Sequence, residues 1–421
     1  MSSRSKFLAV SLLALSVAAG SAPASAQQVP EFWHYMGVGG EYDGVKAMIA
    51  EINKQNPDAP VTERVIPGHT QGLRQQVQVS LMGGTPPMAY QFNSGYDLTQ
   101  VANSGRILDI EDVWQDIRGD EIFPEGLRRI ITFGGVHTAL PISLSIVNDV
   151  FYNKAVFEKL NLTPPTTWEE WNTVCETLEA NNVACLGNSA GWPWSFYNFY
   201  APLLSVVGEE GYWQFARGEL SWTGPEMREA FEIFRENYAE HYAPNWTAAA
   251  WADSSDQLMR GEIGMYQAGN WISGYMKGRG WTPGEDYDFF VAPGTEDQSI
   301  FQTDTVVVLK GDLQEQGKQF VRSVVSVEAQ TAFNQPKGSL APNVEVSTDI
   351  YDVIGKREAE RFATMALPSL MILLPVDYRM AIGTEIEKYA ANPTPEGLET
   401  SLAMLEQMRL SMADQKLFYA W

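Results

Sequence analysis

The residues best suited to chemistry near the start of the chain surround a glycine-rich turn. His34 and Tyr35 end an expected short strand, and Glu41 opens an expected helix directly after Gly-Val-Gly-Gly at 37–40. An aromatic face and polar groups beside a helix N-terminus suit a neutral, polyhydroxylated ligand such as a sugar. The turn lacks the glycine spacing and the Lys-Ser or Lys-Thr pair of phosphate-binding loops, so it predicts no nucleotide site. An alternative explains the same residues equally well: the aromatic residues pack at the end of the strand, and Glu41 is an ordinary acidic residue in the first turn of a helix.

An α/β framework must position these side chains. Helical and strand-like patterns alternate along this part of the chain, which predicts a βαβαβ order and a mostly parallel sheet. The helical segments are 42–56 and 71–82, and the strand segments are 61–66 and 88–93. Because ligands bind beyond the carboxyl ends of parallel strands, Glu41, Gln91 and Asn93 are expected to lie together.

A second α/β body is expected further along the chain. Thr166 or Thr167 is the expected N-cap of a helix with acidic residues in its first turn, and Pro141 marks the expected crossing between domains. More helices are expected at about 194–207, 225–239 and 254–260. The length of 421 residues agrees with two to three domains.

Composition and charge exclude several classes of partner. Hydrophobic residues make up 45% of the chain, which is enough for a sizeable core. The formal net charge of -23 disfavours nucleic acid and anionic membrane surfaces, because like charges repel. No apolar run after the N-terminal region approaches the ~20 residues of a membrane helix, so no direct membrane insertion is expected.

The N-terminal residues predict export. Arg4 and Lys6 precede an apolar run at 7–19, and Ala24-Ser25-Ala26 forms a small-residue cleavage site. This pattern is typical of a secretory signal peptide at 1–26, so the mature chain is expected to start at Gln27. The expected location is the periplasm.

The cysteines and histidines predict neither a metal nor a cofactor. Cys175 and Cys185 are the two cysteines of the chain, and an isolated pair ten residues apart in an exported protein is a plausible disulfide. Two thiols and four scattered histidines show no metal-ligand spacing.

Several motifs together resemble family 1 extracellular solute-binding proteins of ABC importers. The motifs are Met-Gly-Gly-Thr-Pro-Pro at 82–87, Pro-Pro-Thr-Thr-Trp-Glu-Glu-Trp at 164–171, Met-Arg-Gly-Glu-Ile-Gly-Met at 259–265, Gly-Asn-Trp at 269–271 and Phe-Asn-Gln-Pro-Lys-Gly-Ser at 333–339. The similarity covers nearly the whole mature chain. It is greatest to the glucose/mannose-binding branch, where Pro-Gly-Thr precedes an Asp as Pro293-Gly294-Thr295 precedes Asp304 here.

The resemblance implies a two-lobed, Venus-flytrap fold of the class II type, with discontinuous lobes joined by hinge crossings near Pro141, Trp271 and Lys337. One lobe would combine 27–141 with 272–335, and the other 142–271 with 336–421. Such a protein is a monomer that captures a sugar between its lobes and delivers it to the permease subunits of the transporter. It is not an enzyme.

The resemblance also implies which residues contact the sugar. Trp251 and Trp271 match two sugar-contacting tryptophans, and Asp304 and Lys337 match an acid and a lysine of the family's site. The remaining matched positions are Glu41 and Gln91 as first-lobe contacts, Asn93 where a relative has histidine, and Asn270 where relatives often carry Asp. The alternative explanation for Trp251 is packing on its own helix, and that for Lys337 is a solvated charge in a loop.

Further positions rank lower. Trp192 and Trp194 suit cleft aromatics or a surface-loop anchor equally well. Near Pro-Ser-Leu at 368–370 the monosaccharide-binding relatives carry a histidine, whereas this chain has Met371, Ile372 and Leu373. A polar contact has become apolar at Ile372, which favours a glycoside, a disaccharide or a less polar sugar over glucose itself.

An exported glycoside hydrolase is the competing interpretation, because such enzymes also combine tryptophans with carboxylates. It would need two acids that flank one glycosidic bond, for which Glu41 and Asp304 are the candidates. An extracellular scaffold would show repeats or a low-complexity stalk, and the sequence contains neither.

Overall fold

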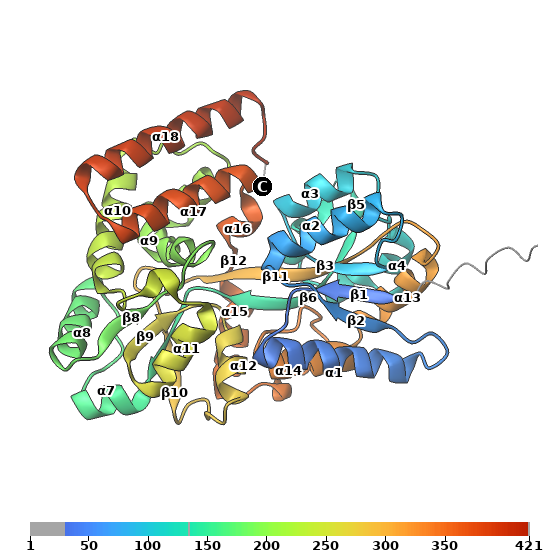
Figure 1. Ribbon diagram of the computed structural model, residues 1–421, viewed down its shortest axis with the longest axis horizontal. Helices are drawn as coiled ribbons and strands as arrows, with labels where there is room; N and C mark the ends of the chain where they lie inside the picture. Colours follow the sequence, from blue (N-terminus) through green and yellow to red (C-terminus); the bar gives the residue numbers. More distant parts are fainter. Residues whose placement is uncertain (1–29, 134, 420–421) are drawn as a thin grey trace, which may run out of the picture.

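The computed structural model describes residues 30–133 and 135–419, so the expected signal peptide lies outside the described residues. The chain forms two α/β lobes, each built around its own sheet (Figure 1). This arrangement confirms the predicted α/β class. Within the described ranges, no helix combines the length and the apolar character needed to cross a membrane.

The first lobe is built on a six-stranded sheet with the order β2-β1-β3-β11-β12, and β6 pairs with β11 on its other side. The strands are β1 (Glu31–His34), β2 (Thr62–Val65), β3 (Ala89–Asn93), β6 (Ala139–Ile146), β11 (Ser299–Val308) and β12 (Ala366–Pro368). The first three strands are parallel, as predicted. The whole sheet is mixed, because β11 returns from the second lobe and runs antiparallel to both β3 and β6.

Helices cover both faces of this sheet (Figure 1). They are α1 (Gly39–Gln55), α2 (His69–Met82), α3 (Tyr96–Asn103), α4 (Glu111–Asp116), α5 (Gly119–Ile122), α6 (Glu125–Arg129), α13 (Gln314–Val324) and α14 (Val327–Lys337), with a small hairpin of β4 (Thr132–Phe133) and β5 (Val136–His137). Helices α1 and α14 lie in close contact. A Cβ atom added at Gly40 would lie 2.3 Å from the Pro336 carbonyl oxygen, and one at Gly44 would lie 2.6 Å from that of Phe333. Only glycine permits this approach, which brings the end of α14 beside the start of α1.

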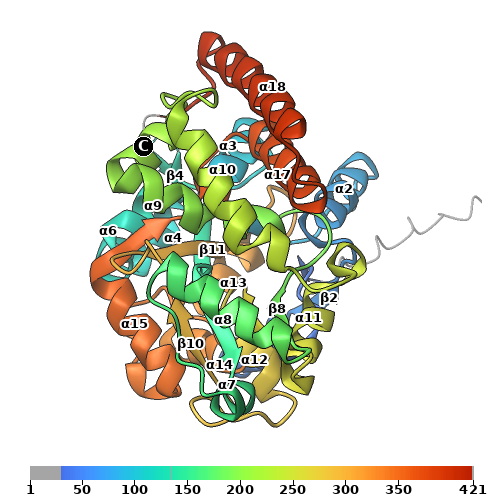
Figure 2. The same cartoon turned by 90° about the vertical axis from the view of Figure 1, so that its left-hand side faces the viewer.

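The second lobe is built on a four-stranded sheet with the order β10-β7-β9-β8. The strands are β7 (Asp149–Asn153), β8 (Ala184–Gly187), β9 (Ile263–Gln267) and β10 (Tyr287–Val291). Its helices are α7 (Lys154–Leu160), α8 (Trp168–Ala180), α9 (Trp194–Ala216), α10 (Pro225–Asn237), α11 (Trp251–Arg260), α12 (Trp271–Lys277), α15 (Val353–Met365), α16 (Leu370–Leu373), α17 (Val376–Ala391) and α18 (Pro395–Asp414), with 3-10 turns η1 (Ala239–His241), η2 (Trp246–Ala248) and η3 (Thr348–Ile350). Helix α18 packs on α17 at the outer side of this lobe (Figure 2).

Three details of the second lobe bear on the sequence analysis. Strand β10 falls within 272–335, the range expected in the first lobe, yet it pairs with β7 in the second sheet. The N-cap of α8 is Thr167, whose side chain accepts a hydrogen bond from the Glu170 backbone N–H. A disulfide between Cys175 and Cys185 joins α8 to β8, with their Cα atoms 4.8 Å apart.

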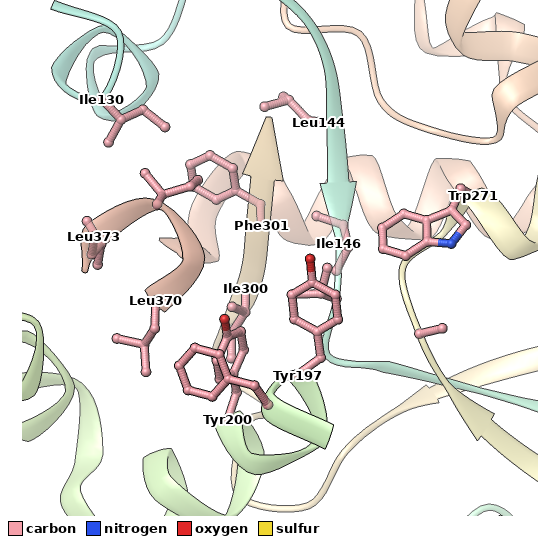
Figure 3. Close-up of a cluster of buried hydrophobic side chains, with 14 of the residues drawn as sticks. Ile130, Leu144, Ile146, Tyr197, Tyr200, Trp271, Ile300, Phe301, Leu370 and Leu373 are labelled. Carbon is pink, nitrogen blue, oxygen red and sulfur yellow. The ribbon is translucent and has the colours of Figure 1, made fainter. Parts of the chain in front are cut away.

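The lobes are joined by strand connections that run side by side. Strand β6 continues into β7, and β10 returns through β11, so the two connections form an antiparallel crossing. Asn148 ties them together: its amide donates to Thr295 Oγ1 at 3.0 Å and accepts from the Ile300 backbone N–H at 2.9 Å. A buried apolar cluster surrounds the crossing, with Ile146 and Ile300 on the crossing strands facing Tyr197 and Tyr200 of α9 (Figure 3). This packing fixes the position of α9 relative to both sheets.

Candidate functional site

A cavity of about 240 Å³ lies where the two lobes meet. Predicted site residues from both lobes line it. They are Tyr35, Glu41, Asn93, Asp304 and Lys337 from the first lobe, and Trp192, Trp194, Trp251 and Trp271 from the second. Residues from β1, α1, β3, β11 and α14 meet here because β1, β3 and α14 end and α1 begins at this edge of the first sheet, and Asp304 of β11 lies opposite Asn93 at the end of β3. Of the three residues expected to lie together beyond the carboxyl ends of the parallel strands, Glu41 and Asn93 line the cavity, whereas Gln91 lies behind its surface.

The Asp304 carboxylate is the centre of a polar cluster on the first-lobe side. Its Oδ1 accepts hydrogen bonds from Gln91 Nε2 at 2.8 Å and from the Tyr35 hydroxyl at 3.2 Å. Its Oδ2 accepts from Lys337 Nζ at 2.7 Å and from Ser143 Oγ at 2.9 Å. The carboxylate is thus held in one orientation with its charge compensated.

Electrostatics keep Asp304 ionised. Burial by itself would raise the pKa of this carboxyl, but the adjacent Lys337 ammonium and the hydrogen bonds from Gln91 and Ser143 outweigh burial and lower the pKa below its usual value. Lys337 is buried and lies in the last turn of α14, where the close packing on α1 places it. A charged pair with fixed geometry can orient hydroxyl groups by charge-assisted hydrogen bonds.

Glu41 lies beside this pair, in the first turn of α1. Burial raises its pKa to about 7, with Lys337 acting in the opposite direction and Asp304 adding to the rise. Near neutral pH its carboxyl group therefore exists in both protonation states and can donate as well as accept a hydrogen bond. Tyr35 completes this side of the cavity and stacks on His69, with ring centroids 4.7 Å apart.

The second lobe contributes an aromatic wall. The rings of Trp194 and Trp271 are 6.2 Å apart at 62°, and Tyr197 lies within 6.4 Å of Trp271. The Tyr197 hydroxyl donates to Gln302 Oε1 of β11 at 2.6 Å, which fixes the wall to the crossing strand. Trp251 packs edge-on against Tyr275, with centroids 5.1 Å apart. Flat apolar faces of this kind suit the C–H faces of a sugar ring.

Four predicted residues do not line the cavity. His34 is buried on the opposite side of β1, where it bonds to Glu63 at 3.0 Å, because successive strand residues alternate between the faces of a sheet. Gln91 lies behind the surface and holds Asp304 and the Tyr35 backbone N–H. Asn270 is buried beneath Trp271 and donates to Glu358 at 2.9 Å. Ile372 is buried against Gly95, and its neighbour Met371 faces the cavity instead.

The cavity also contains polar residues that the sequence analysis did not identify. They are His69, Thr70, Gln71, Arg74, Ser145, Tyr197, Gln302 and Arg379. The segment 69–74 is the start of α2, and its position after the second strand of a βαβ unit was an available signal. Arg379 lies in α17, between the cavity residues Met371 and Met380, but no pattern in that helix singled it out in the sequence.

The site has no features of a metal centre. Among the described residues, no group of three or more His, Cys, Asp or Glu side chains is arranged to hold a metal ion. The arrangement of a fixed ion pair, amides, hydroxyls and flat aromatic faces is suited to binding a small polar molecule with apolar faces.

The two-lobed fold and the cavity between the lobes define the class of solute-binding proteins. Residues 38–331 match the family described as bacterial extracellular solute-binding proteins, and the chain belongs to that family. Among its relatives is an uncharacterized ABC transporter extracellular-binding protein of Pyrococcus horikoshii, with 28% identity over 83% of this chain and 81% of the relative. Another is described as a "Probable sugar-binding periplasmic protein" of Rhizobium meliloti, with 24% identity over 84% of this chain and 85% of the relative.

Solved structures share the fold. The bacterial solute receptor AcbH, described as having an exclusive preference for β-D-galactopyranose, superimposes with a TM-score of 0.82 and 21% identity over 91% of this chain and 98% of that chain. The solute-binding protein RafE in complex with raffinose superimposes with a TM-score of 0.72 and 18% identity over 90% of this chain and 99% of that chain.

Proposed function

We propose that the protein is the periplasmic substrate-binding component of an ABC importer for a carbohydrate, which it captures between its lobes and delivers to the permease. The observation that carries this proposal is the composition of the cavity. The tryptophan wall of the second lobe faces the Asp304–Lys337 cluster of the first, so a sugar can place its C–H face on Trp271 and its hydroxyls on Asp304.

The relatives support the same function. One is described as a sugar-binding periplasmic protein, another as the xylose/arabinose-binding protein XacG of Haloferax volcanii, and structural neighbours bind galactose or raffinose. The motif around Asp304 and Lys337 favours the glucose/mannose-binding branch within the family. The cavity volume of about 240 Å³ lies just below the range of about 300 to 1,000 Å³ of drug-sized ligand pockets, so the proposed ligand is a monosaccharide or a small glycoside.

The lobes are proposed to act as a hinge. The proposed bounds are 27–141 and 272–335 for the first lobe and 142–271 and 336–421 for the second, except that α12 and β10 belong with the second sheet, and the end of β6, Lys337 and β12 belong with the first. A ligand that contacts both lobes binds the closed state better than the open one, so it shifts the population towards closure. The closed monomer then presents a new surface to the permease. The signal peptide at 1–26 would direct export to the periplasm.

A thermal-shift screen of the mature protein against monosaccharides, disaccharides, glycosides and polyols tests the proposal. A ligand that binds only the folded state raises the melting temperature by mass action. We expect a carbohydrate to raise it. The absence of a shift with every carbohydrate would overturn the carbohydrate assignment.

The variant Trp271→Ala identifies the site. Loss of the flat apolar face should weaken the binding of the identified sugar by about tenfold or more, with little change in the free protein's fold. Trp168→Ala, in α8 of the second lobe and away from the cavity, is the matched control and should leave affinity unchanged. Equal affinity in Trp271→Ala and the wild type would remove Trp271 from the site.

The purified wild-type protein should release no free sugar from glycosides, and sustained release would favour the glycoside hydrolase instead.

A further inference from the structure

Two guanidinium groups share one carboxylate at one end of the cavity. Arg74 of α2 and Arg379 of α17 both line the cavity, and both form ion pairs with Asp97 of α3, which lies behind them. Arg379 Nη2 donates to Asp97 Oδ1 at 2.6 Å, and Asn93 Nδ2 donates to the other oxygen at 3.0 Å. Within the part of the chain that the structure describes, no other carboxylate forms an ion pair with either guanidinium.

The charges at this end of the cavity do not cancel. Asp97 is fully buried, and although burial by itself would raise its pKa, the two arginines lower that pKa below its usual value. Asp97 therefore carries a single negative charge against two permanent positive charges, because arginine does not deprotonate in proteins. Lys337 does not add to the excess, since Asp304 compensates it. One positive charge remains at this end in a chain with a formal net charge of -23.

Hydrogen-bonding capacity is also left over. The Arg379 side chain is 3% exposed; its Nη1 donates to the Met371 backbone carbonyl, and its Nε has no hydrogen-bond partner among the described residues. Arg74 Nε has none either. Buried donors without partners are costly, so their presence in a cavity wall points to a ligand that supplies the acceptors.

We infer that the proposed carbohydrate ligand carries a carboxylate, as in a uronic acid, which binds between Arg74 and Arg379. This inference rests on the proposed function. A carboxylate matches the forked donors of a guanidinium and neutralises the single excess charge, which a neutral hydroxyl does not. The carboxyl groups of Glu41 and Asp304 disfavour an acid group beside them, so the acid group of the ligand faces the arginines and the sugar hydroxyls face Glu41 and Asp304.

The inferred acid group also contributes to closure. Arg74 belongs to the first lobe and Arg379 to the second, so a bound carboxylate contacts guanidinium groups from both lobes. The interaction is complete only when the lobes are closed, and it therefore stabilises that state over the open one.

Isothermal titration calorimetry of the mature protein with matched sugars tests the inference. The probes are galactose and galacturonate, glucose and glucuronate, and mannose and mannuronate, with galactose 1-phosphate as a further anion. We expect the uronate of the preferred sugar to bind about tenfold or more tighter than its neutral counterpart, because its hydrogen bonds are charge-assisted. In Arg74→Gln the affinity for the uronate should fall more than that for the neutral sugar, so their ratio decreases.

Arg118→Gln is the matched control, since it removes an exposed arginine of the first lobe that does not line the cavity. Its ratio of affinities should equal that of the wild type. A neutral sugar that binds as tightly as its uronate would overturn the inference and leave the proposed function intact. Tighter binding of the sugar phosphate than of any uronate would overturn the carboxylate assignment. Binding of none of these probes by a protein that responds to another carbohydrate in the thermal-shift screen would overturn the inference alone, whereas no response to any carbohydrate would contradict the proposed function itself.

Discussion

Removal of the Lys337 ammonium group, with Asp304 left in place, should destabilise the protein strongly. In Lys337→Met the Asp304 carboxylate, whose side chain is 12% exposed and which lies 2.7 Å from its partner in the wild type, is left without a compensating charge. Breaking a buried ion pair on one side costs about 3–5 kcal/mol. The hydrogen bonds from Tyr35, Gln91 and Ser143 remain, so we expect the lower end of this range, about 3 kcal/mol.

Urea unfolding of a double-mutant cycle measures the coupling. The cycle consists of Lys337→Met, Asp304→Asn and the double variant, in which no buried charge is left unpaired. The double variant should be more stable than the sum of the single effects predicts, with an interaction energy of about 2 kcal/mol. Lys277→Met is the control: it breaks a 2.8 Å ion pair with Asp352 whose side chains are both 26% exposed, and it should cost less than about 1 kcal/mol.

The reasoning would be refuted by a simple result. If Lys337→Met destabilises the protein no more than Lys277→Met does, burial does not make the Asp304–Lys337 pair interdependent. The same conclusion would follow if the two single effects were additive. In either case the fixed orientation of the Asp304 carboxylate could not be attributed to Lys337.

Two further predictions concern stability. The pKa of Glu41 is raised to about 7 by burial, so the native state holds a proton that the unfolded state has lost, and the free energy of unfolding should fall by up to about 3 kcal/mol as the pH rises from about 4.5 to 7. Urea titrations at several pH values should show a flatter profile for Glu41→Gln, and parallel profiles would contradict the prediction. Replacing Cys175 and Cys185 by alanine should cost about 2–3 kcal/mol, because the loop between them is short. Calorimetric sugar affinity should be unchanged, since neither cysteine lines the cavity, and dithiothreitol should lower the melting temperature of the wild type but not of the variant.

Local patterns in the sequence were sufficient for the framework of the first lobe. The helical spacing of Val45, Met48, Ile49 and Ile52 predicted α1, and alternating strands and helices predicted the parallel arrangement of β1, β2 and β3. These features depend on interactions between residues close in sequence, so periodicity and helix-capping residues indicate them. The family motifs extended the prediction to the two-lobed fold.

The composition of the cavity depended on contacts that local patterns do not encode. Because successive residues of a strand face opposite sides of the sheet, His34 points away from the side that Tyr35 faces. The register between β3 and β11 makes Gln91 a support for Asp304. Strand β10 joined the second sheet because it pairs with β7, more than a hundred residues earlier in the chain.

The sequence by itself determined the α/β class, the first strands and helices, and the residue types of a sugar-binding site, because each follows from short-range periodicity or from motifs. Only the tertiary structure decided that Arg74 and Arg379 share Asp97 at the end of that site. Arg379 is separated from Asp97 by 282 positions. Charges so distant in sequence acquire a common electrostatic environment only when the fold brings α2, α3 and α17 together, and the inferred preference for an acid group rests on that environment.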